Sequence, residues 1–415
     1  MTENKRKSPS LESDLLLDIT KKITSTLDFE EVLDLIVDSL SNLVSYDAAG
    51  ILLVDERTGT LRQMATRGYD RDMLEKFPLK INQGISGQVI QTKKASIISD
   101  VSKSAYYFPS RPETKSQITV PLFSGEDVIG VLVLESNKLN HFIQSDLKRL
   151  TAFASLASIA IDNAKLYEDS LRKERLESDL LVASKIQKAL LPTRPTCVPG
   201  LRLEAVNIPS LIVGGDFYDV FRSDGNQLGI AIGDVSGKGT PGAILMAVVY
   251  AGFKSLVKEI YQVSEIVARL NNLIEEATTS GYFATFFLGI IDPAKNQLSY
   301  CNAGHNPPLL INHQKNVEYL DKGGMLLGFL HDQSYTQQIV EFKKSDYLIL
   351  YTDGVTEVKN PGGEEFGETR LKNIVLDNFG ESPMEMKNAV LKAIEDFSGR
   401  TDFPDDITLL IARRE

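Results

Sequence analysis

The stretch Leu228-Gly-Ile-Ala-Ile-Gly-Asp-Val-Ser-Gly-Lys-Gly239 decides the fold of the C-terminal half of the chain. Its apolar beginning predicts a buried strand and its closely spaced glycines predict a sharp turn, so Asp234 stands at the junction. The arrangement returns at Asp353, which follows the apolar run Tyr347–Tyr351 and precedes a glycine. Because a strand end fixes a side chain more firmly than a loop does, we expect both carboxylates at the edge of a sheet.

Two further motifs carry aspartates in comparable places, Gly214-Gly-Asp-Phe-Tyr-Asp219 and Asp405-Asp-Ile-Thr408. Carboxylates that meet at the end of an apolar sheet repel one another and lose hydration, so a cation must compensate them. No cluster of Lys or Arg accompanies the motifs, and all-oxygen ligands favour magnesium or manganese over zinc. Any one motif alone is explained as well by a turn aspartate that caps backbone N–H groups. The four motifs together favour a metal site.

A pair of divalent ions suits attack on a phosphate ester, because the two ions activate a bridging water and screen the developing charge. The sequence offers no rival nucleophile: Cys197 and Cys301 lack the Cys-x5-Arg context of a cysteine phosphatase, and no Gly-x-Ser-x-Gly motif is present. We therefore predict a metal-dependent hydrolase of phosphate esters.

The composition is that of an ordinary globular protein, with 42% hydrophobic and 24% charged residues among 415. The formal net charge of −11 argues against a nucleic-acid partner, which normally requires a basic face. No apolar run approaches the ~20 residues of a membrane span, and the polar N-terminus does not match a signal peptide. We expect a cytoplasmic protein without membrane contact.

The N-terminal third of the chain predicts one mixed α/β domain. Asp28 and Glu31 are expected to form a capping pair at the start of a helix. Two hairpins are expected, from Ala49–Val54 with Leu61–Thr66 and from Val120–Phe123 with Val128–Glu135.

From Ser145 to Leu191 the sequence contains neither Gly nor Pro, which predicts one long helix. Its apolar residues follow the steps of a coiled-coil seam: Leu147, Leu150, Ala154, Ala157, Ile161 and Ala164. Because so long a stripe needs a partner, we expect a parallel homodimer through this helix. The alternative is that the helix packs on its own domain.

The residues after this helix predict a second domain rich in strands. Expected strands are Leu228–Ile232, Phe283–Ile291, Leu298–Asn302, Pro308–Ile311, Tyr347–Tyr351 and Ile407–Ala412. Expected helices are Pro241–Val257, Ser264–Thr278 and Pro383–Ser398.

The four aspartate motifs, in this order, resemble the catalytic domain of the metal-dependent (PPM-type) serine/threonine protein phosphatases, and the bacterial SpoIIE and RsbU branch in particular. Phe283-Ala-Thr-Phe-Phe287 and Asn302-Ala-Gly-His-Asn-Pro-Pro308 are also similar to that branch. The resemblance covers residues 185–415. It implies an α/β/β/α sandwich with two divalent metals, Mn or Mg, at one edge of paired antiparallel sheets.

The resemblance also implies roles for the motif residues. Asp234 resembles the carboxylate that bridges both metals, and Val235 stands where a backbone carbonyl supports one metal's water shell. Asp216, Asp353 and Asp405 match metal-site aspartates, and Asp216 and Asp234 are the residues expected to serve catalysis.

Five other residues are expected around these. Asp219 and Asp406 are expected behind the metal ligands as supports. Ser236 stands where animal members of the family place a histidine that is a candidate general acid, so the leaving oxygen must obtain its proton otherwise. Lys238 is the candidate for holding phosphate, and His305 is expected to be structural.

The order of helix, hairpin, Ile81-Asn-Gln-Gly-Ile-Ser-Gly87, second hairpin and closing helix resembles a GAF domain. Such domains bind small ligands or mediate dimerisation. Asn137-Lys138, Phe142 and Asp146 partly match the motif of cyclic-nucleotide-binding members, but Leu147 replaces its final Glu. We therefore expect structural roles for these residues.

The expected fold class is α+β, in four parts. These are a disordered tail (residues 1–11), a GAF α/β sensor domain (12–150), a helical coiled-coil linker (151–191) and an α/β/β/α sandwich phosphatase domain (192–415).

By resemblance we expect a bacterial signalling phosphatase that acts on phosphoserine or phosphothreonine. The expected substrate is a phosphorylated anti-anti-sigma (STAS-type) protein, and the expected regulator is the GAF domain with an unknown small ligand. A signal there would shift Pro241–Val257, which follows Asp234. Two alternatives stay open: a catalytically silent scaffold that binds signalling partners, and a GAF domain that only dimerises.

Overall fold

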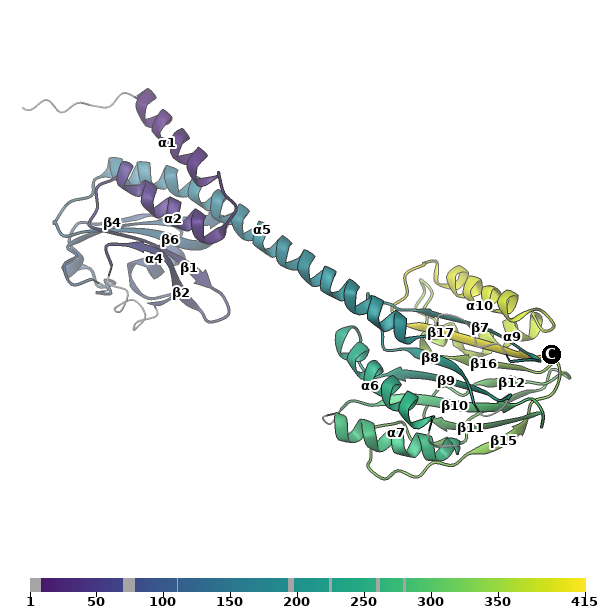
Figure 1. Ribbon diagram of the computed structural model, residues 1–415. Coiled ribbons are helices and arrows are strands. Elements are labelled where there is room, and N and C mark those ends of the chain that lie inside the picture. Colours follow the sequence, from purple (N-terminus) through teal and green to yellow (C-terminus); the bar gives the residue numbers. More distant parts are fainter. Residues whose placement is uncertain are drawn as a thin grey trace, which may run out of the picture. The chain divides into compact units, whose positions relative to one another are not determined.

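The computed structural model describes residues 9–69, 79–109, 111–192, 198–223, 226–258, 262–278 and 281–415 (Figure 1). The chain forms two compact units, Met1–Leu176 and Glu177–Glu415, whose boundary falls inside the long helix α5 (Gln144–Leu190). Cys197 lies outside the described residues, and Cys301 is a buried free thiol.

Unit 1 is built on one antiparallel sheet with the strand order β3-β2-β1-β6-β5-β4. Its strands are β1 (Ala48–Asp55), β2 (Thr60–Arg67), β3 (Leu79–Lys80), β4 (Ser96–Ile98), β5 (Ser116–Ser124) and β6 (Asp127–Ser136). β1 pairs with β2 and β5 pairs with β6, so both predicted hairpins are confirmed.

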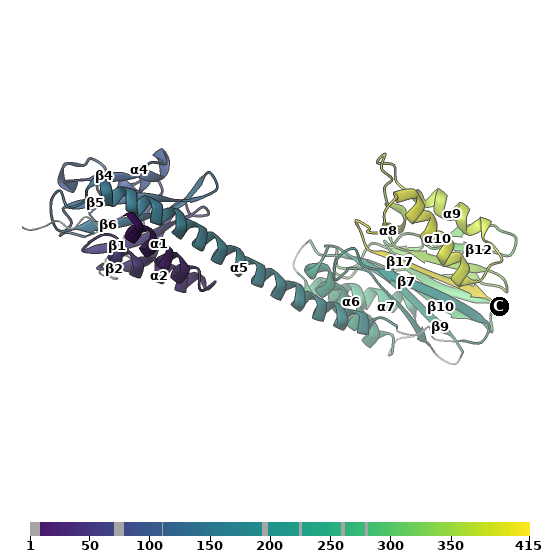
Figure 2. The same cartoon turned by 90° about the horizontal axis from the view of Figure 1, so that it is seen from above.

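Helices cover both faces of this sheet (Figure 2). They are α1 (Pro9–Ile23), α2 (Phe29–Ser39), α4 (Gly84–Thr92) and the first half of α5, with short 3₁₀ helices at Leu40–Asn42 and Val101–Lys103. α1, α2 and α5 share a core with Ile51 on one face, and α4 packs against Leu52 on the other. Successive residues of β1 therefore serve two different cores, as strand geometry requires.

The N-terminus of unit 1 corrects two expectations. Residues 9–11, assigned to the disordered tail, form the first turn of α1, while residues 1–8 lie outside the described residues. Asp28 does cap α2 by accepting a hydrogen bond from the Glu31 N–H at 2.9 Å. Glu31, however, accepts from the Thr26 hydroxyl instead of reaching the backbone of Asp28.

The long helix is confirmed, but the expectation that its first seam faces a partner is wrong. It begins at Gln144, where the Asp146 carboxylate accepts from the Ile143 N–H at 3.0 Å. The apolar seam is buried in the core of unit 1, because α2 and the sheet already cover that side: Leu150, Ala154, Ala157, Ile161 and Ala164. The apolar residues that α5 exposes lie elsewhere on the helix, at Leu166, Leu176, Leu181, Val182 and Ile186 among others.

Unit 2 contains two sheets. One has the order β14-β11-β10-β9-β8, with β15 also paired to β11, and the other has the order β13-β12-β16-β17-β7. The first comprises β8 (Phe217–Arg222), β9 (Leu228–Val235), β10 (Ala284–Asp292), β11 (Gln297–Ala303), β14 (Gly323–Gly324) and β15 (Gln338–Glu341). The second comprises β7 (Leu201–Ile208), β12 (Leu309–Ile311), β13 (Val317–Tyr319), β16 (Tyr347–Tyr351) and β17 (Ile407–Arg414).

The two sheets pack face to face around a core that includes Phe287, Tyr300, Leu348 and Leu410. The outer layers are α6 (Thr240–Leu256) and α7 (Val263–Ala277) on the first sheet, and α8 (Asp353–Thr356), α9 (Gly367–Asp377) and α10 (Pro383–Ser398) on the second. The predicted α/β/β/α sandwich is therefore confirmed.

Candidate functional site

Carboxylates gather where strands of both sheets of unit 2 end. Asp216 immediately precedes β8 and Asp234 lies near the end of β9; Phe217 pairs with Gly233, so the two aspartates stand opposite each other. Asp353 begins α8 directly after β16, and another aspartate stands just before β17. We call these four residues the carboxylate edge: Asp216, Asp234, Asp353 and Asp405.

Asp216 joins the two sheets. Its buried Oδ2 accepts hydrogen bonds from the Thr352 hydroxyl at 2.6 Å and the Thr408 hydroxyl at 2.7 Å, at the ends of β16 and β17. The backbone N–H of Thr408 in turn donates to the Thr352 hydroxyl at 3.0 Å. Burial, and then the neighbouring Asp234, raise the pKa of Asp216 well above its usual range.

The remaining carboxylates are close enough to repel one another. Burial, followed by the charges of Asp353 and Asp405, raises the pKa of Asp234 to about 7, against the opposing hydrogen bond with Asp216. Burial and then Asp405 also raise the pKa of Asp353. Such mutual perturbation is typical of a functional site whose carboxylates are stabilised by a cation.

Asp406 organises the loop that carries Asp216. Its Oδ1 accepts from the N–H of Ser210 at 2.7 Å, and its Oδ2 accepts from the N–H of Gly215 at 2.6 Å. A Cβ atom on Gly214 would lie 2.4 Å from Asp406 Oδ2, so no other residue fits there without displacing the carboxylate. This geometry agrees with the supporting role expected for Asp406.

The turn after β9 brings three more predicted residues to the edge. The Lys238 ammonium lies 2.8 Å from Asp405 Oδ2 and donates to the carbonyl of Pro404 at 2.9 Å. The Val235 carbonyl lies so near Gly215 that a Cβ there would be 3.0 Å away. Ser236 accepts a hydrogen bond from the Phe283 N–H at 3.0 Å and thereby ties the turn to β10.

Two other residues lie in settings of their own. Asp219 pairs with Lys254 of α6 at 2.6 Å, because an odd separation along a strand turns its side chain to the opposite face from Asp216. His305 is buried with Nδ1 2.8 Å from the Thr285 hydroxyl, and burial lowers its pKa to about 4. A buried, neutral imidazole bonded through Nδ1 agrees with the structural role expected for this residue.

The donors of the carboxylate edge fit hard divalent ions, since they are carboxylate oxygens and the Val235 carbonyl. Among the ion pairs of the described residues, Lys238 provides the one cation on these four aspartates. As they stand, the described His, Cys, Asp and Glu side chains include no group of three placed to hold a metal ion. Asp405 Oδ2 is engaged by Lys238, so coordination through that oxygen requires the lysine to move away.

Several residues that shape the site were not predicted from the sequence. Thr352 and Thr408 stand inside the aspartate motifs, where their hydroxyls could have been identified as partners of a buried carboxylate. Gln187, near the end of α5, donates to the Gly214 carbonyl at 2.6 Å and accepts from the Gly214 N–H at 3.1 Å. No local pattern connects a helix residue to a loop so distant in the chain.

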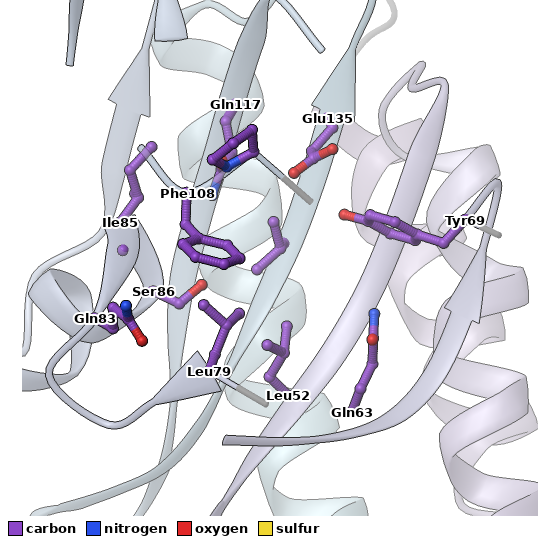
Figure 3. Close-up of a pocket in the computed structure, with 13 residues that line it drawn as sticks. Leu52, Gln63, Tyr69, Leu79, Gln83, Ile85, Ser86, Phe108, Gln117 and Glu135 are labelled. Carbon is purple, nitrogen blue, oxygen red and sulfur yellow. The ribbon is translucent and has the colours of Figure 1, made fainter. Parts of the chain in front are cut away.

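Unit 1 contains a cavity between its sheet and α4 (Figure 3). Its polar end is Glu135, which is buried, accepts from the Thr114 hydroxyl at 2.6 Å and is hydrogen-bonded by the Tyr69 hydroxyl. Burial raises the pKa of Glu135. The remaining lining combines amides with apolar and aromatic groups: Leu52, Gln63, Leu79, Ile85, Ser86, Phe108, Gln117 and Val133.

The residues that partly match a cyclic-nucleotide motif do not line this cavity. Phe142 is in the core, and the Asn137 N–H donates to Asp47 at 2.7 Å. Asp146 caps α5 and lies 4.0 Å from Arg149.

Comparison with known families agrees with this architecture. Residues 224–415 match the family of Stage II sporulation protein E (SpoIIE), and residues 26–162 match the GAF domain family. The chain thus joins a GAF domain to a SpoIIE-type serine/threonine phosphatase domain of the PPM class. The recognition of both families from the sequence is confirmed.

Curated relatives agree with this assignment. The chain is 29% identical over 247 residues to phosphoserine phosphatase RsbU of Bacillus subtilis, covering 59% of this chain and 72% of RsbU. It is 30% identical over 284 residues to protein IcfG of Synechocystis sp., covering 60% of this chain. The chain spans less than half of IcfG (43%) and of phosphoserine phosphatase RsbP of Bacillus subtilis (47%).

A solved structure shows the same fold for unit 2. The SiaA-PP2C domain of Pseudomonas aeruginosa superposes with a TM-score of 0.54 and 22% identity, covering 59% of this chain and 99% of that domain. Separately, none of the helices in the described residues is both long enough and apolar enough to cross a membrane.

Proposed function

We propose that this chain is a cytoplasmic signalling phosphatase that hydrolyses phosphoserine or phosphothreonine on a partner protein, under the control of its GAF domain. The observation that carries the proposal is the carboxylate edge: aspartates from both sheets of a SpoIIE-type domain meet at one place, where burial raises their pKa and their mutual repulsion raises it further. The names of RsbU and RsbP support phosphoserine as the substrate group.

In this proposal Asp216, Asp234, the Val235 carbonyl, Asp353 and Asp405 would hold two divalent ions, Mn or Mg. When bound, these ions would supply an activated water as the nucleophile and neutralise charge on the phosphate. The threonine hydroxyls keep Asp216 fixed, which limits reorganisation during the reaction.

The chain's own groups also constrain the proton transfers. His305 is buried, neutral and bonded to Thr285, so it does not protonate the leaving oxygen. Ser236 occupies the position of the animal histidine and is bonded to backbone. We therefore assign protonation of the leaving serine or threonine oxygen to water.

The test is hydrolysis of an aryl phosphate and of a phosphorylated STAS-type protein by the full chain with added Mn²⁺. Asp234→Asn should abolish both activities, whereas Asp321→Asn, which changes an exposed aspartate outside the edge, should retain them. A wild-type chain that binds Mn²⁺ but hydrolyses neither substrate would favour the silent scaffold. Activity on aryl phosphate alone would remove the STAS-type substrate from the proposal.

Control by the GAF domain can reach the site through the end of α5. Gln187 holds Gly214 by both backbone groups, and Gly214 lies two residues before Asp216. α6 starts soon after Asp234 and flanks the same helix end, where the two helices line an apolar groove with Leu190 and Ile244. A shift of α5 would therefore move the loop that carries one ligand and the helix that follows another.

We further propose that a second copy of the chain covers the exposed apolar residues near the end of α5, giving a parallel homodimer. Ile186 is 62% exposed and Ile244 of α6 is 62% exposed, beside the same groove. Ile186→Asp should therefore shift the full chain from dimer to monomer in analytical ultracentrifugation, while Lys185→Asp, at the preceding exposed position, should not. A monomeric wild-type chain would contradict this part.

The cavity of unit 1 is the proposed site of a small regulatory ligand. Its polar end is an acidic group framed by hydroxyls, so it would repel a phosphate and favour a ligand that donates hydrogen bonds or carries positive charge. We expect cyclic AMP not to bind the full chain in calorimetry. Binding of cyclic AMP with an affinity that Glu135→Gln alters would place the nucleotide in this cavity and overturn this assignment.

A further inference from the structure

Lys238 occupies an unusual place for a surface lysine. It stands between Gly237 and Gly239, whose φ angles of 100° and 69° place this turn in conformations that favour glycine. Its side chain is 57% exposed, yet its ammonium makes two polar contacts at the carboxylate edge, with Asp405 Oδ2 at 2.8 Å and the Pro404 carbonyl at 2.9 Å.

The ammonium of Lys238 offsets part of the repulsion between the neighbouring carboxylates. Asp234, Asp353 and Asp405 repel one another, and Lys238 is the cation that pairs with one of them among the described residues. An ammonium at a carboxylate oxygen satisfies the same need as a metal ion at that oxygen. The two cannot hold Asp405 Oδ2 together without strong repulsion between like charges.

We infer that Lys238 is a built-in counter-ion that competes with a divalent cation for Asp405 and turns to the substrate phosphate when the cation displaces it. This inference rests on the proposed function and deepens it by naming a residue that sets metal affinity. The flexible four-carbon stem and the flanking glycines allow the ammonium to move away without disturbing β9 or α6.

The inference and a purely structural ion pair predict opposite changes in metal affinity when Lys238 is replaced. If Lys238 only fixes Asp405, its removal loosens a ligand and weakens metal binding. If Lys238 competes, its removal frees Asp405 and strengthens metal binding. A partly exposed ion pair of this kind should change the dissociation constant by about three- to tenfold.

The experiment is a calorimetric titration of the full chain with Mn²⁺ alone, which measures the dissociation constant of the metal. Lys238→Met should bind Mn²⁺ about three- to tenfold more tightly than wild type, and the charge-preserving Lys238→Arg should stay near wild type. Equal or weaker Mn²⁺ binding by Lys238→Met would overturn the competition. Lys238→Gln is the second neutral variant should the methionine variant fold poorly, as judged by circular dichroism.

A second measurement tests whether the Lys238 ammonium contacts phosphate once the metal is bound. With Mn²⁺ saturating, inorganic phosphate should inhibit Lys238→Met about tenfold less effectively than wild type if the lysine meets phosphate. Unchanged inhibition would remove that half of the inference. If wild type binds no Mn²⁺ and hydrolyses nothing, the proposed function fails; if wild type does both and Lys238→Met binds no more tightly, only the inference fails.

Discussion

Each unit of this chain buries carboxylate, but the neighbours differ. Glu135 in unit 1 stands with two hydroxyl donors, from Thr114 and Tyr69, and its charge is satisfied locally. The aspartates of unit 2 stand near one another: burial raises their pKa, and the charges of the neighbouring carboxylates raise it further. The comparison shows that burial alone does not mark a metal site: Asp216, like Glu135, accepts from two hydroxyls, and the deciding feature is the presence of further carboxylates beside it.

The largest expected effect is a loss of hydrolysis when a carboxylate of unit 2, but not one of unit 1, is replaced. Asp234→Asn should lower Mn²⁺-dependent hydrolysis by about 10³-fold or more, because it removes the proposed bridging ligand. Without divalent ions the same variant should melt at an equal or higher temperature than wild type, since it removes repulsion. Glu135→Gln should leave hydrolysis of an aryl phosphate within a few-fold of wild type. A similar loss of activity in both variants would contradict the claim that hydrolysis depends on the carboxylates of unit 2 and not on Glu135.

The pH dependence of stability should follow the raised pKa of Asp234. A folded-state pKa of about 7, against 3.8 for the usual carboxyl, means that the folded chain binds more protons between these values. In chelator, the free energy of unfolding of unit 2 should therefore fall as the pH rises from about 4 to about 7. Differential scanning calorimetry should show this slope in wild type and a flatter one in Asp234→Asn. A rising slope in wild type would contradict the prediction.

In unit 1 the stability of the folded state should depend on the hydroxyl groups that donate hydrogen bonds to Glu135. Thr114→Val removes one hydrogen bond to the buried Glu135 and should cost about 1–3 kcal/mol, seen as a lower midpoint for the unit 1 transition in urea. Thr92→Val, at an exposed helix position, is the matched control. Adding Glu135→Gln to Thr114→Val should recover part of the loss, because it removes the charge left short of a donor.

The smallest effect should come from the contact between α5 and the site. Gln187→Leu removes both hydrogen bonds to Gly214 and should lower kcat of the full chain by a few-fold, up to about tenfold. Gln144→Leu, at the exposed start of the same helix, should have no effect. Identical kinetics for Gln187→Leu and wild type would show that the loop carrying Asp216 does not depend on α5.

Strongly patterned segments of the fold were predictable from the sequence. The apolar runs of β9 and β16 and the Gly- and Pro-free length of α5 specify their elements locally. β7 and β8 were not predicted, because charged residues interrupt them and their pairing with β17 and β9 is what makes them strands. The burial of the α5 seam was also beyond the sequence, since a seam that faces its own sheet and one that faces a partner have the same spacing.

The site shows the same division. Asp234 and Asp353 could be placed at strand ends because each follows an apolar run. The partner of Asp219 was not predicted, because the motif gives no sign of the alternation that turns this side chain toward Lys254. The threonine partners of Asp216 and the contact of Gln187 come from segments far apart in the chain, and only the packing of the two sheets brings them together.

The bonds from Asp216 to Thr352 and Thr408 have a practical consequence. They span the joint between two sheets, so the placement of this proposed metal ligand depends on how those sheets are aligned and not on either sheet alone. A slide of about 1 Å, small enough to keep every strand and helix, would stretch the hydroxyl contacts from 2.6 and 2.7 Å to beyond hydrogen-bond distance. Mild heating or pressure should therefore silence this enzyme while its circular dichroism still reports an intact protein.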